Sequence, residues 1–325
     1  MYKAFYSLKR NPFEITPDPS FLFSTKRHNE ALAALYYGVR RRKGFVVLTG
    51  EVGTGKTLLV RCLLQILKRA DVAFAYVFNS RLNPMEFLQY VAGDFHLSTA
   101  GKSKSELLLD LGSYVISRSQ RNLTTVLIVD EAHHLSADVL EEVRLLTNLE
   151  TPQAKLLQIL LIGQPELDEK LDCDNLRQLK QRIALRSRLG PLDLDEAGGY
   201  IHRRLQLAGS SHPEVIFPLD TVIEVHRHSR GYPRLINTLC ENGLIQAYAK
   251  QSQSVTPEMI EEIAIDFRLN IVHRSSSEEA EKDHSSDVQR AARTLLDLYS
   301  YLREAQHDQG DFRTLTRAGK HEPFV

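Results

Sequence analysis

The stretch that decides the fold of this chain is Gly50-Glu51-Val52-Gly53-Thr54-Gly55-Lys56-Thr57. Its glycine, lysine and threonine positions match the phosphate-binding pattern GxxxxGK[ST] without a mismatch. Residues 45–49 before it are apolar and rich in β-branched side chains, as in a buried strand, and residues 58–67 after it suit a buried helix. A strand, a glycine turn and a helix in this order predict a loop that binds a nucleoside triphosphate.

The residue types of this loop fit the chemistry of a bound triphosphate. Glycines let the backbone curl so that successive N–H groups face phosphate oxygens. The positive end of the following helix adds to that field. Lys56 is expected to reach the β- and γ-phosphates, and the Thr57 hydroxyl to ligate Mg²⁺. We therefore predict that residues 50–57 together contact the nucleotide.

The composition is that of an ordinary folded protein. The chain has 325 residues, 42% hydrophobic and 25% charged, and is long enough for two domains. Its 41 basic and 41 acidic residues cancel, which argues against broad electrostatic binding of nucleic acid. A local basic run, Arg40-Arg41-Arg42-Lys43, remains as a solvated helix end or a binding patch. The three cysteines are isolated, so neither a zinc site nor a disulfide framework is predicted.

Targeting signals are absent from the sequence. The first residues lack the apolar core of a signal peptide, and no run of about 18 or more apolar residues occurs. We therefore expect a cytoplasmic protein without a transmembrane segment, which would reach the inner membrane only peripherally, through partners.

Apolar runs alternate with helical patterns in the first part of the chain, as in βαβ units. The strands are predicted at residues 45–49, 72–78, 125–129 and 156–162, with a short fifth at 188–192. Helices are predicted at residues 29–39, 58–67, 84–95 and 105–118. Because these strands are apolar on both faces, we expect a mostly parallel sheet covered by helices on both sides. Beyond residue 195 only helical patterns remain, at residues 196–208, 219–229, 234–250 and 257–268.

The fold class predicted from this order is α/β, a three-layer phosphate-loop domain with a five-stranded sheet, followed by a small all-α lid domain. Residues 1–43 are assigned to an N-terminal segment and helix, whose phenylalanines suggest packing along a domain. Residues 44–193 form the predicted α/β domain and residues 194–270 the lid. Residues 271–325 are a polar linker and tail. One amphipathic helix is predicted there from the spacing of Val288, Ala291, Leu295, Tyr299 and Leu302.

Two acids follow the third predicted strand, where a phosphate-loop enzyme needs a carboxylate for its metal. Asp130 is expected to hold the water shell of Mg²⁺, and Glu131 to orient and deprotonate the attacking water. With the phosphate loop, this pair favours hydrolysis over binding alone. Residues 130–133 also spell the DEAH motif of one helicase class, but the second domain of those helicases has no counterpart here. His133 and His134 without a third partner are weak metal-ligand candidates.

Three further polar residues are candidates for the same chemistry. Gln164 follows the fourth strand and would hold the water or sense the γ-phosphate; alternatively, Gly163 and Pro165 only set a turn. Arg182 lies on the flank far from the phosphate loop, so it would act on a neighbour's nucleotide in a ring. Arg234, near the start of a lid helix, would contact the γ-phosphate of its own chain. For both arginines the alternative is a surface salt bridge of little energetic value.

These elements in this order resemble the AAA+ ATPases, and more narrowly the ExeA/GspA type associated with type II secretion. The motifs that carry the resemblance are Phe5-Tyr6-Ser7-Leu8, Asn11-Pro12-Phe13, Pro17-Asp18-Pro19, Phe21-Leu22-Phe23, the phosphate loop with its preceding strand, Asp130-Glu131-Ala132-His133-His134-Leu135, Ile162-Gly163-Gln164-Pro165-Glu166-Leu167 and Pro233-Arg234-Leu235-Ile236-Asn237. They cover roughly residues 1–270.

The resemblance implies an ATP hydrolase that uses ATP and Mg²⁺, assembles into rings such as hexamers, and serves an envelope secretion or polysaccharide-export machine. It makes Arg182 the trans finger, Gln164 the first sensor and Arg234 the second. Secretion members of this type carry a membrane helix and a peptidoglycan-binding portion after the ATPase domain. This sequence continues into a polar tail instead, so we expect a shorter relative without that portion.

Two other functions compete with this prediction. Related AAA+ proteins select targets for transposases, so the first alternative is a DNA-associated transposition regulator; zero net charge disfavours it. The second is a nucleotide-gated scaffold that hydrolyses ATP slowly and uses the tail as its output.

Overall fold

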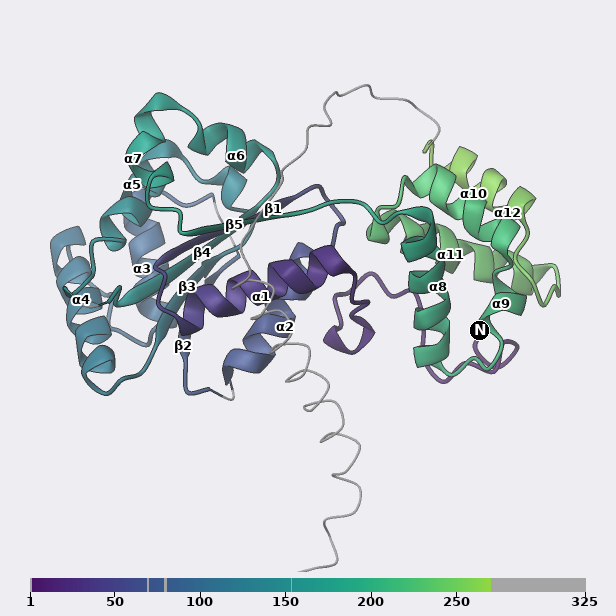
Figure 1. Ribbon diagram of the computed structural model, residues 1–325, viewed down its shortest axis with the longest axis horizontal. Helices are drawn as coiled ribbons and strands as arrows, with labels where there is room; N and C mark the ends of the chain where they lie inside the picture. Colours follow the sequence, from purple (N-terminus) through teal and green to yellow (C-terminus); the bar gives the residue numbers. More distant parts are fainter. Residues whose placement is uncertain (1, 69, 79–80, 153, 270–325) are drawn as a thin grey trace, which may run out of the picture.

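The computed structural model describes residues 2–68, 70–78, 81–152 and 154–269. Figure 1 shows an α/β body and a helical body side by side, joined by the start of the chain and by the strand that leads into α8. The polar tail and the amphipathic helix predicted from residues 288–302 lie outside the described residues.

The α/β body is built on one sheet of parallel strands. The strands are β1 (Phe45–Gly50), β2 (Ala73–Val77), β3 (Thr125–Val129), β4 (Leu157–Gly163) and β5 (Leu185–Leu189). Their spatial order is β2-β3-β4-β1-β5. Leu161 of β4 is paired with Val47 of β1 on one side and with Val129 of β3 on the other. All carboxyl ends therefore meet at one edge, which is where ligands bind in open parallel sheets.

Helices cover both faces of the sheet, and the period-two alternation of the strands explains how. Val46 and Leu48 of β1 pack on α1 (Lys26–Arg40) and α2 (Lys56–Lys68), whereas Phe45 and Val47 face the opposite core. That second core is formed with α3 (Pro84–Asp94), α4 (Lys104–Gln120) and α5 (Ala137–Leu146). The predicted parallel α/β sheet is confirmed.

The fifth strand was predicted in the wrong place. The sequence pattern pointed to residues 188–192, but β5 spans Leu185–Leu189 and pairs with β1 at the sheet margin. β5 is an edge strand, and its Leu189 is buried on the α1 side. Arg186 and Arg188 occupy the alternate positions of the same strand. A strand of this kind has no continuous apolar run, which is the pattern that predicts a strand buried on both faces.

The helical body follows directly. Its helices are α8 (Leu194–Ala208), α9 (Pro213–Ile216), α10 (Leu219–Ser229), α11 (Pro233–Ala249) and α12 (Pro257–Asp266). Asp193 and Glu196 form a capping box that starts α8, and Gly209, with φ of 114°, ends it. Ile201, Leu239 and other apolar side chains fill the core between the helices.

The first residues of the chain belong to the core of the helical body. Tyr6 and Phe13 are buried there, and the Lys9 N–H donates to the carbonyl of Ala208 at 2.7 Å. The chain then crosses to the α/β body, where Arg61 of α2 donates to the carbonyl of Pro17 at 2.6 Å. A 3₁₀ turn, η1 (Pro19–Phe21), leads to α1. The N-terminal segment therefore connects both bodies (Figure 1).

Candidate nucleotide-binding and hydrolysis site

The phosphate loop joins β1 to α2 at the carboxyl edge of the sheet. Gly53 and Gly55 have φ of 82° and 97°, in the left-handed region that side chains disfavour. A Cβ on Gly50 would lie 2.9 Å from the carbonyl oxygen of Leu189, so this glycine lets β5 approach. Thr54 donates its hydroxyl to the carbonyl of Glu51 at 2.8 Å and closes the turn. The loop thus has the curled backbone that a phosphate cradle requires.

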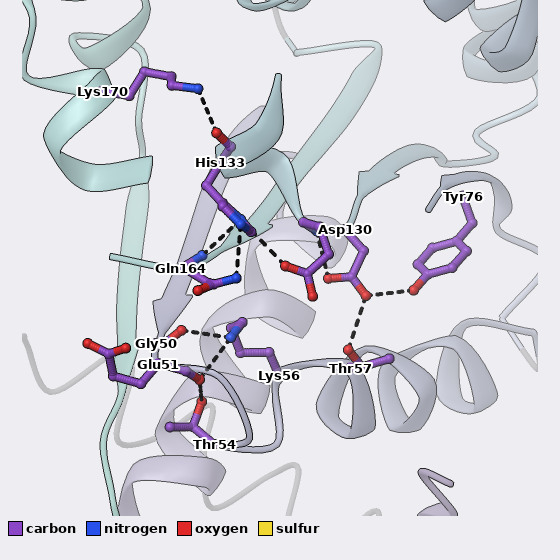
Figure 2. A network of polar contacts seen from close by, with 11 residues as sticks. Gly50, Glu51, Thr54, Lys56, Thr57, Tyr76, Asp130, His133, Gln164 and Lys170 are labelled. Atoms are coloured by element: carbon purple, nitrogen blue, oxygen red, sulfur yellow. Dashed lines mark hydrogen bonds and ion pairs between the residues drawn. The ribbon is translucent and has the colours of Figure 1, made fainter. Parts of the chain in front are cut away.

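Lys56 lies within this loop rather than in solvent. Its Nζ donates to the carbonyls of Gly50 at 2.7 Å and Glu51 at 3.0 Å, as Figure 2 shows. Burial lowers the pKa of Lys56, and the nearby carboxylates of Glu131 and Asp130 oppose that shift. The ammonium therefore sits at the loop, close to both predicted acids.

A histidine of α1 supports the loop from behind. His28 places Nε2 3.0 Å from the carbonyl of Thr54, while its Nδ1 lies 2.7 Å from the Thr25 hydroxyl. Burial lowers the pKa of His28, so the ring is neutral at neutral pH. Sequence reasoning missed this residue. The spacing of His28 to the buried Leu32, Leu35 and Val39 would have placed it on the inner face of α1.

The second support comes from the helical body. The backbone N–H of Arg234, in the first turn of α11, donates to the carbonyl of Gly53 at 3.2 Å. A Cβ on Gly53 would stand 2.6 Å from the Cβ of Arg234, so the loop and the helix touch. The structure therefore brings the predicted second sensor to the phosphate loop.

Asp130 and Thr57 meet at the end of β3. Asp130 is 4% exposed, and its Oδ2 accepts from the Thr57 hydroxyl at 3.2 Å. The same Oδ2 accepts from the Tyr76 hydroxyl at 2.8 Å, and Oδ1 accepts from the Glu131 N–H at 2.9 Å. Burial raises the pKa of Tyr76, which keeps the phenol a donor. Tyr76 of β2 is a second residue that sequence reasoning missed, because a strand tyrosine gives no signal of its own.

The Thr57–Asp130 pair fits a magnesium ion. A hydroxyl and a carboxylate are hard oxygen donors, and Mg²⁺ takes one or two such groups together with water and substrate phosphates. Among the residues that the structure describes, no cluster of three or more His, Cys, Asp and Glu side chains has metal-binding geometry.

Glu131, His133 and Gln164 come together at the ends of β3 and β4. Glu131 has φ of 51° and precedes the short 3₁₀ turn η2 (Ala132–His134). The Nδ1 of His133 lies 3.4 Å from the Glu131 carboxylate, and its Nε2 lies 2.9 Å from the Gln164 amide nitrogen. Gln164 was predicted beside the acids, and its backbone N–H also donates to Nδ1 of His133 at 3.4 Å (Figure 2).

Arg182 lies elsewhere. It follows α7 (Arg177–Lys180) and precedes β5, and its Nη1 donates to the Thr147 hydroxyl at 2.5 Å and to the Asn148 side-chain oxygen at 2.6 Å. Ala184 nearby donates to Phe45 at the amino end of β1. Phe45 and Gly50 are five residues apart on β1, which corresponds to about 17 Å. Arg182 is therefore remote from its own phosphate loop.

Known proteins share this architecture. A family model described as an AAA domain matches residues 39–171. General secretion pathway protein A of Aeromonas hydrophila is 44% identical over 256 residues, which are 78% of this chain and 46% of that protein. The chain thus corresponds to about half the length of this relative.

Solved structures give the same fold. The ORC2 protein of Aeropyrum pernix, in ADPNP–ADP complexes, is 17% identical with a TM-score of 0.58, over 79% of this chain and 72% of that one. Drosophila ORC bound to DNA is 21% identical with a TM-score of 0.60, over 79% of this chain and 64% of that one. At these identities the likeness shows the fold alone. The relative, the AAA domain and the phosphate loop together show that the chain is a P-loop ATPase of the AAA type, similar to General secretion pathway protein A.

Proposed function

We propose that the chain hydrolyses ATP in a Mg²⁺-dependent reaction at the carboxyl edge of its sheet. The observation that carries this proposal is the convergence of Lys56, Thr57 and Asp130, with the Thr57 hydroxyl 3.2 Å from Asp130. A phosphate clamp and two metal-suited oxygens occupy one place, and Glu131 follows Asp130 directly. A site that binds nucleotide without hydrolysis would not need a base beside the metal carboxylate.

Each residue has a distinct role in the proposed reaction. The loop N–H groups and Lys56 bind the phosphates, while Thr57 and Asp130 hold Mg²⁺, which supplies charge neutralisation when bound. Glu131 orients the attacking water and accepts its proton. Gln164 and Arg234 sense the γ-phosphate, and the contact of Arg234 with Gly53 supports the coupling of the helical body to the loop.

We also propose that the ATPase works as a ring. The position of Arg182 at the amino edge supports this, because an arginine there could stabilise the transferring phosphoryl group only in an adjacent subunit. The similarity to General secretion pathway protein A supports a role in an envelope secretion or export machine. Among the described residues no helix is both long and apolar enough to cross a bilayer.

Calorimetry and phosphate release test the enzymatic proposal. The purified chain should bind MgATP with measurable heat and release phosphate, and EDTA should abolish the release. A folded chain that gives no heat with MgATP would overturn the proposal. Partners recovered from cells with the Glu131→Gln variant, which should hold ATP without turning it over, test the role in the envelope. Recovery of no envelope protein would count against that role.

A further inference from the structure

Arg182 makes its hydrogen bonds through one nitrogen of its guanidinium. Nη1 donates to the Thr147 hydroxyl at 2.5 Å and to the Asn148 side-chain oxygen at 2.6 Å, which uses both of its hydrogens. Nε and Nη2 have no hydrogen-bond partner among the residues that the structure describes. Their N–H groups lie on one side of the planar fork, where they can bind two oxygens of a phosphate together. The arginine is therefore anchored at one nitrogen and open at the other two.

The Thr147 hydroxyl is oriented to accept from this arginine. Thr147 follows α5, which packs against α7 (Figure 1), and is only 4% exposed. Its hydroxyl donates its single hydrogen to the carbonyl of Arg144 at 2.6 Å, so a lone pair of Oγ1 is left for Arg182. Lys155 holds the same turn, because its Nζ donates to the carbonyl of Thr147 at 3.2 Å. The acceptor is thus fixed by the end of α5 and not by the arginine.

The two anchoring groups are neutral, although carboxylates lie nearby. Glu141 accepts two hydrogen bonds from Arg144, at 2.7 and 2.6 Å, and Glu150 pairs with Lys155. Arg144 is the main cause that lowers the pKa of Glu141, and Arg182 adds a smaller contribution. Each of these carboxylates is therefore bound to another cation, and the charge of Arg182 remains available to an anion outside the chain.

We propose that Thr147 and Asn148 are positioning residues that direct Arg182 toward the nucleotide of a neighbouring subunit. The inference rests on the proposed ring mechanism. In this arrangement Nη1 stays on its two neutral acceptors, while Nε–H and Nη2–H donate to oxygens of the neighbour's γ-phosphate. The acceptors restrict a long side chain before it binds, so less conformational entropy is lost on binding, and they leave its charge uncompensated.

Asn148→Asp separates positioning from charge. Asn148 is exposed, and aspartate has nearly the same shape, so the change leaves the core intact. The new carboxylate should form an ion pair with Arg182 and compete with the phosphate, which lowers kcat about ten-fold or more. The MgATP Kd should change less than about two-fold, because the phosphate loop is untouched. Asn148→Ala, which only loosens the arginine, should lose less, and a parental kcat in Asn148→Asp would overturn the inference.

Thr147→Ser and Thr147→Val form a matched pair at the second anchor. Serine keeps the hydroxyl that accepts from Nη1, whereas valine keeps the shape of threonine and removes the acceptor. We expect Thr147→Ser to stay within about two-fold of the parental kcat and Thr147→Val to lose about ten-fold. Equal rates for the two variants would contradict the proposed role of Thr147.

Mixing of subunits shows on which side of the interface the defect lies. An Asn148→Asp subunit has an intact phosphate loop and an impaired arginine. Lys56→Ala subunits, which carry an unimpaired Arg182, should therefore restore part of its rate. Arg182→Ala subunits should restore nothing, because neither subunit then supplies a free arginine. Restoration by Arg182→Ala subunits, or by neither partner, would overturn the inference, since the defect would then lie outside the trans contact.

The controls distinguish this inference from the function on which it rests. Asn175→Asp adds the same charge at an exposed position of the 3₁₀ turn η3 (Asp174–Leu176) and should keep kcat within about two-fold of the parent. If the parent neither binds nor hydrolyses ATP, the proposed function fails. If the parent is active and Arg182→Ala is equally active, the ring mechanism fails. An inactive Arg182→Ala together with an unaffected Asn148→Asp removes only the positioning role.

Discussion

The two edges of the central sheet carry different candidate functional residues. The carboxyl edge gathers Lys56, Asp130 and Gln164 around one phosphate loop. The amino edge carries Arg182 and the basic run at residues 40–43, about 17 Å away along β1. The proposed mechanism assigns nucleotide binding and the general base to the first edge, and gives the second edge an arginine that acts on the nucleotide of a neighbouring subunit. Full activity therefore requires a ring of subunits in this mechanism.

The largest expected effect is at the carboxyl edge, with Lys56→Ala. Loss of the only side-chain cation built into the loop pattern should weaken MgATP binding by about 100-fold or more, since charge-assisted contacts to phosphate are the strong ones. Titration calorimetry checks this. Lys68→Ala is the matched control, because Lys68 is exposed at the other end of the same helix and should bind ATP like the parent. Parental affinity in Lys56→Ala would remove the phosphate loop from the mechanism.

Arg182→Ala probes the amino edge. A trans arginine contributes about 10³-fold or more to hydrolysis, so activity should fall by that order while the chain still binds ATP. Mixing with Lys56→Ala subunits should restore part of the rate, because each subunit supplies what the other lacks. The exposed Arg177 on α7 offers the control Arg177→Ala, with activity near the parent. Absence of rescue at every mixing ratio would argue that Arg182 only holds Thr147 and Asn148.

Glu131→Gln separates binding from hydrolysis at the carboxyl edge. Removal of the general base should lower kcat by about 10²- to 10⁴-fold, with MgATP affinity retained and the ATP-bound assembly trapped. Phosphate release and size-exclusion chromatography with ATP measure both properties. Glu169→Gln, at an exposed position of α6 (Glu166–Leu171), should behave as the parent does. A parental rate in Glu131→Gln would assign the base to another group.

The difference between the edges also explains what the sequence could predict. The phosphate loop and Asp130 stand in fixed local patterns, so their positions followed from neighbours in the chain. The position of β5 could not be predicted in the same way, because this edge strand contains Arg186 and Arg188 and lacks the apolar run of a central strand. A continuous apolar run identifies a strand only when the strand is buried on both faces.

The residues that support the phosphate loop and Asp130 could not be predicted from local patterns for a different reason. His28 and Tyr76 reach the loop and Asp130 from segments 26 and 54 residues away along the chain. Packing of Tyr6 and Phe13 into the helical body likewise depends on contacts across the whole fold. Single hydrogen bonds between distant segments leave no periodicity to read.

A smaller effect should appear in the pH dependence of stability. Burial lowers the pKa of His28 in the folded chain, while the unfolded chain keeps the ordinary value of 6.5. Below pH 6.5 the unfolded state therefore binds more protons, and the free energy of unfolding falls as the pH falls. Urea unfolding at pH 7.5 and pH 5.5 should show a weaker pH dependence for His28→Gln than for the parent. Identical dependences would mean that His28 is not held neutral by its contacts with Thr25 and Thr54.

The smallest expected effect concerns the basic run at the amino edge. Arg42 donates to the Asn122 side chain and the Leu123 carbonyl, each at 3.3 Å, so it is structural, whereas Arg40, Arg41 and Lys43 are available for contact at an exposed turn. Replacing these three by glutamine should leave ATP hydrolysis within about two-fold of the parent, because the run lies at the edge opposite the site. Fluorescence anisotropy with duplex DNA at physiological salt should show only weak binding by the parent, as expected for zero net charge. Tight, salt-sensitive binding that the triple variant loses would reverse this expectation, since the amino edge would then act on DNA as well as on a neighbouring subunit.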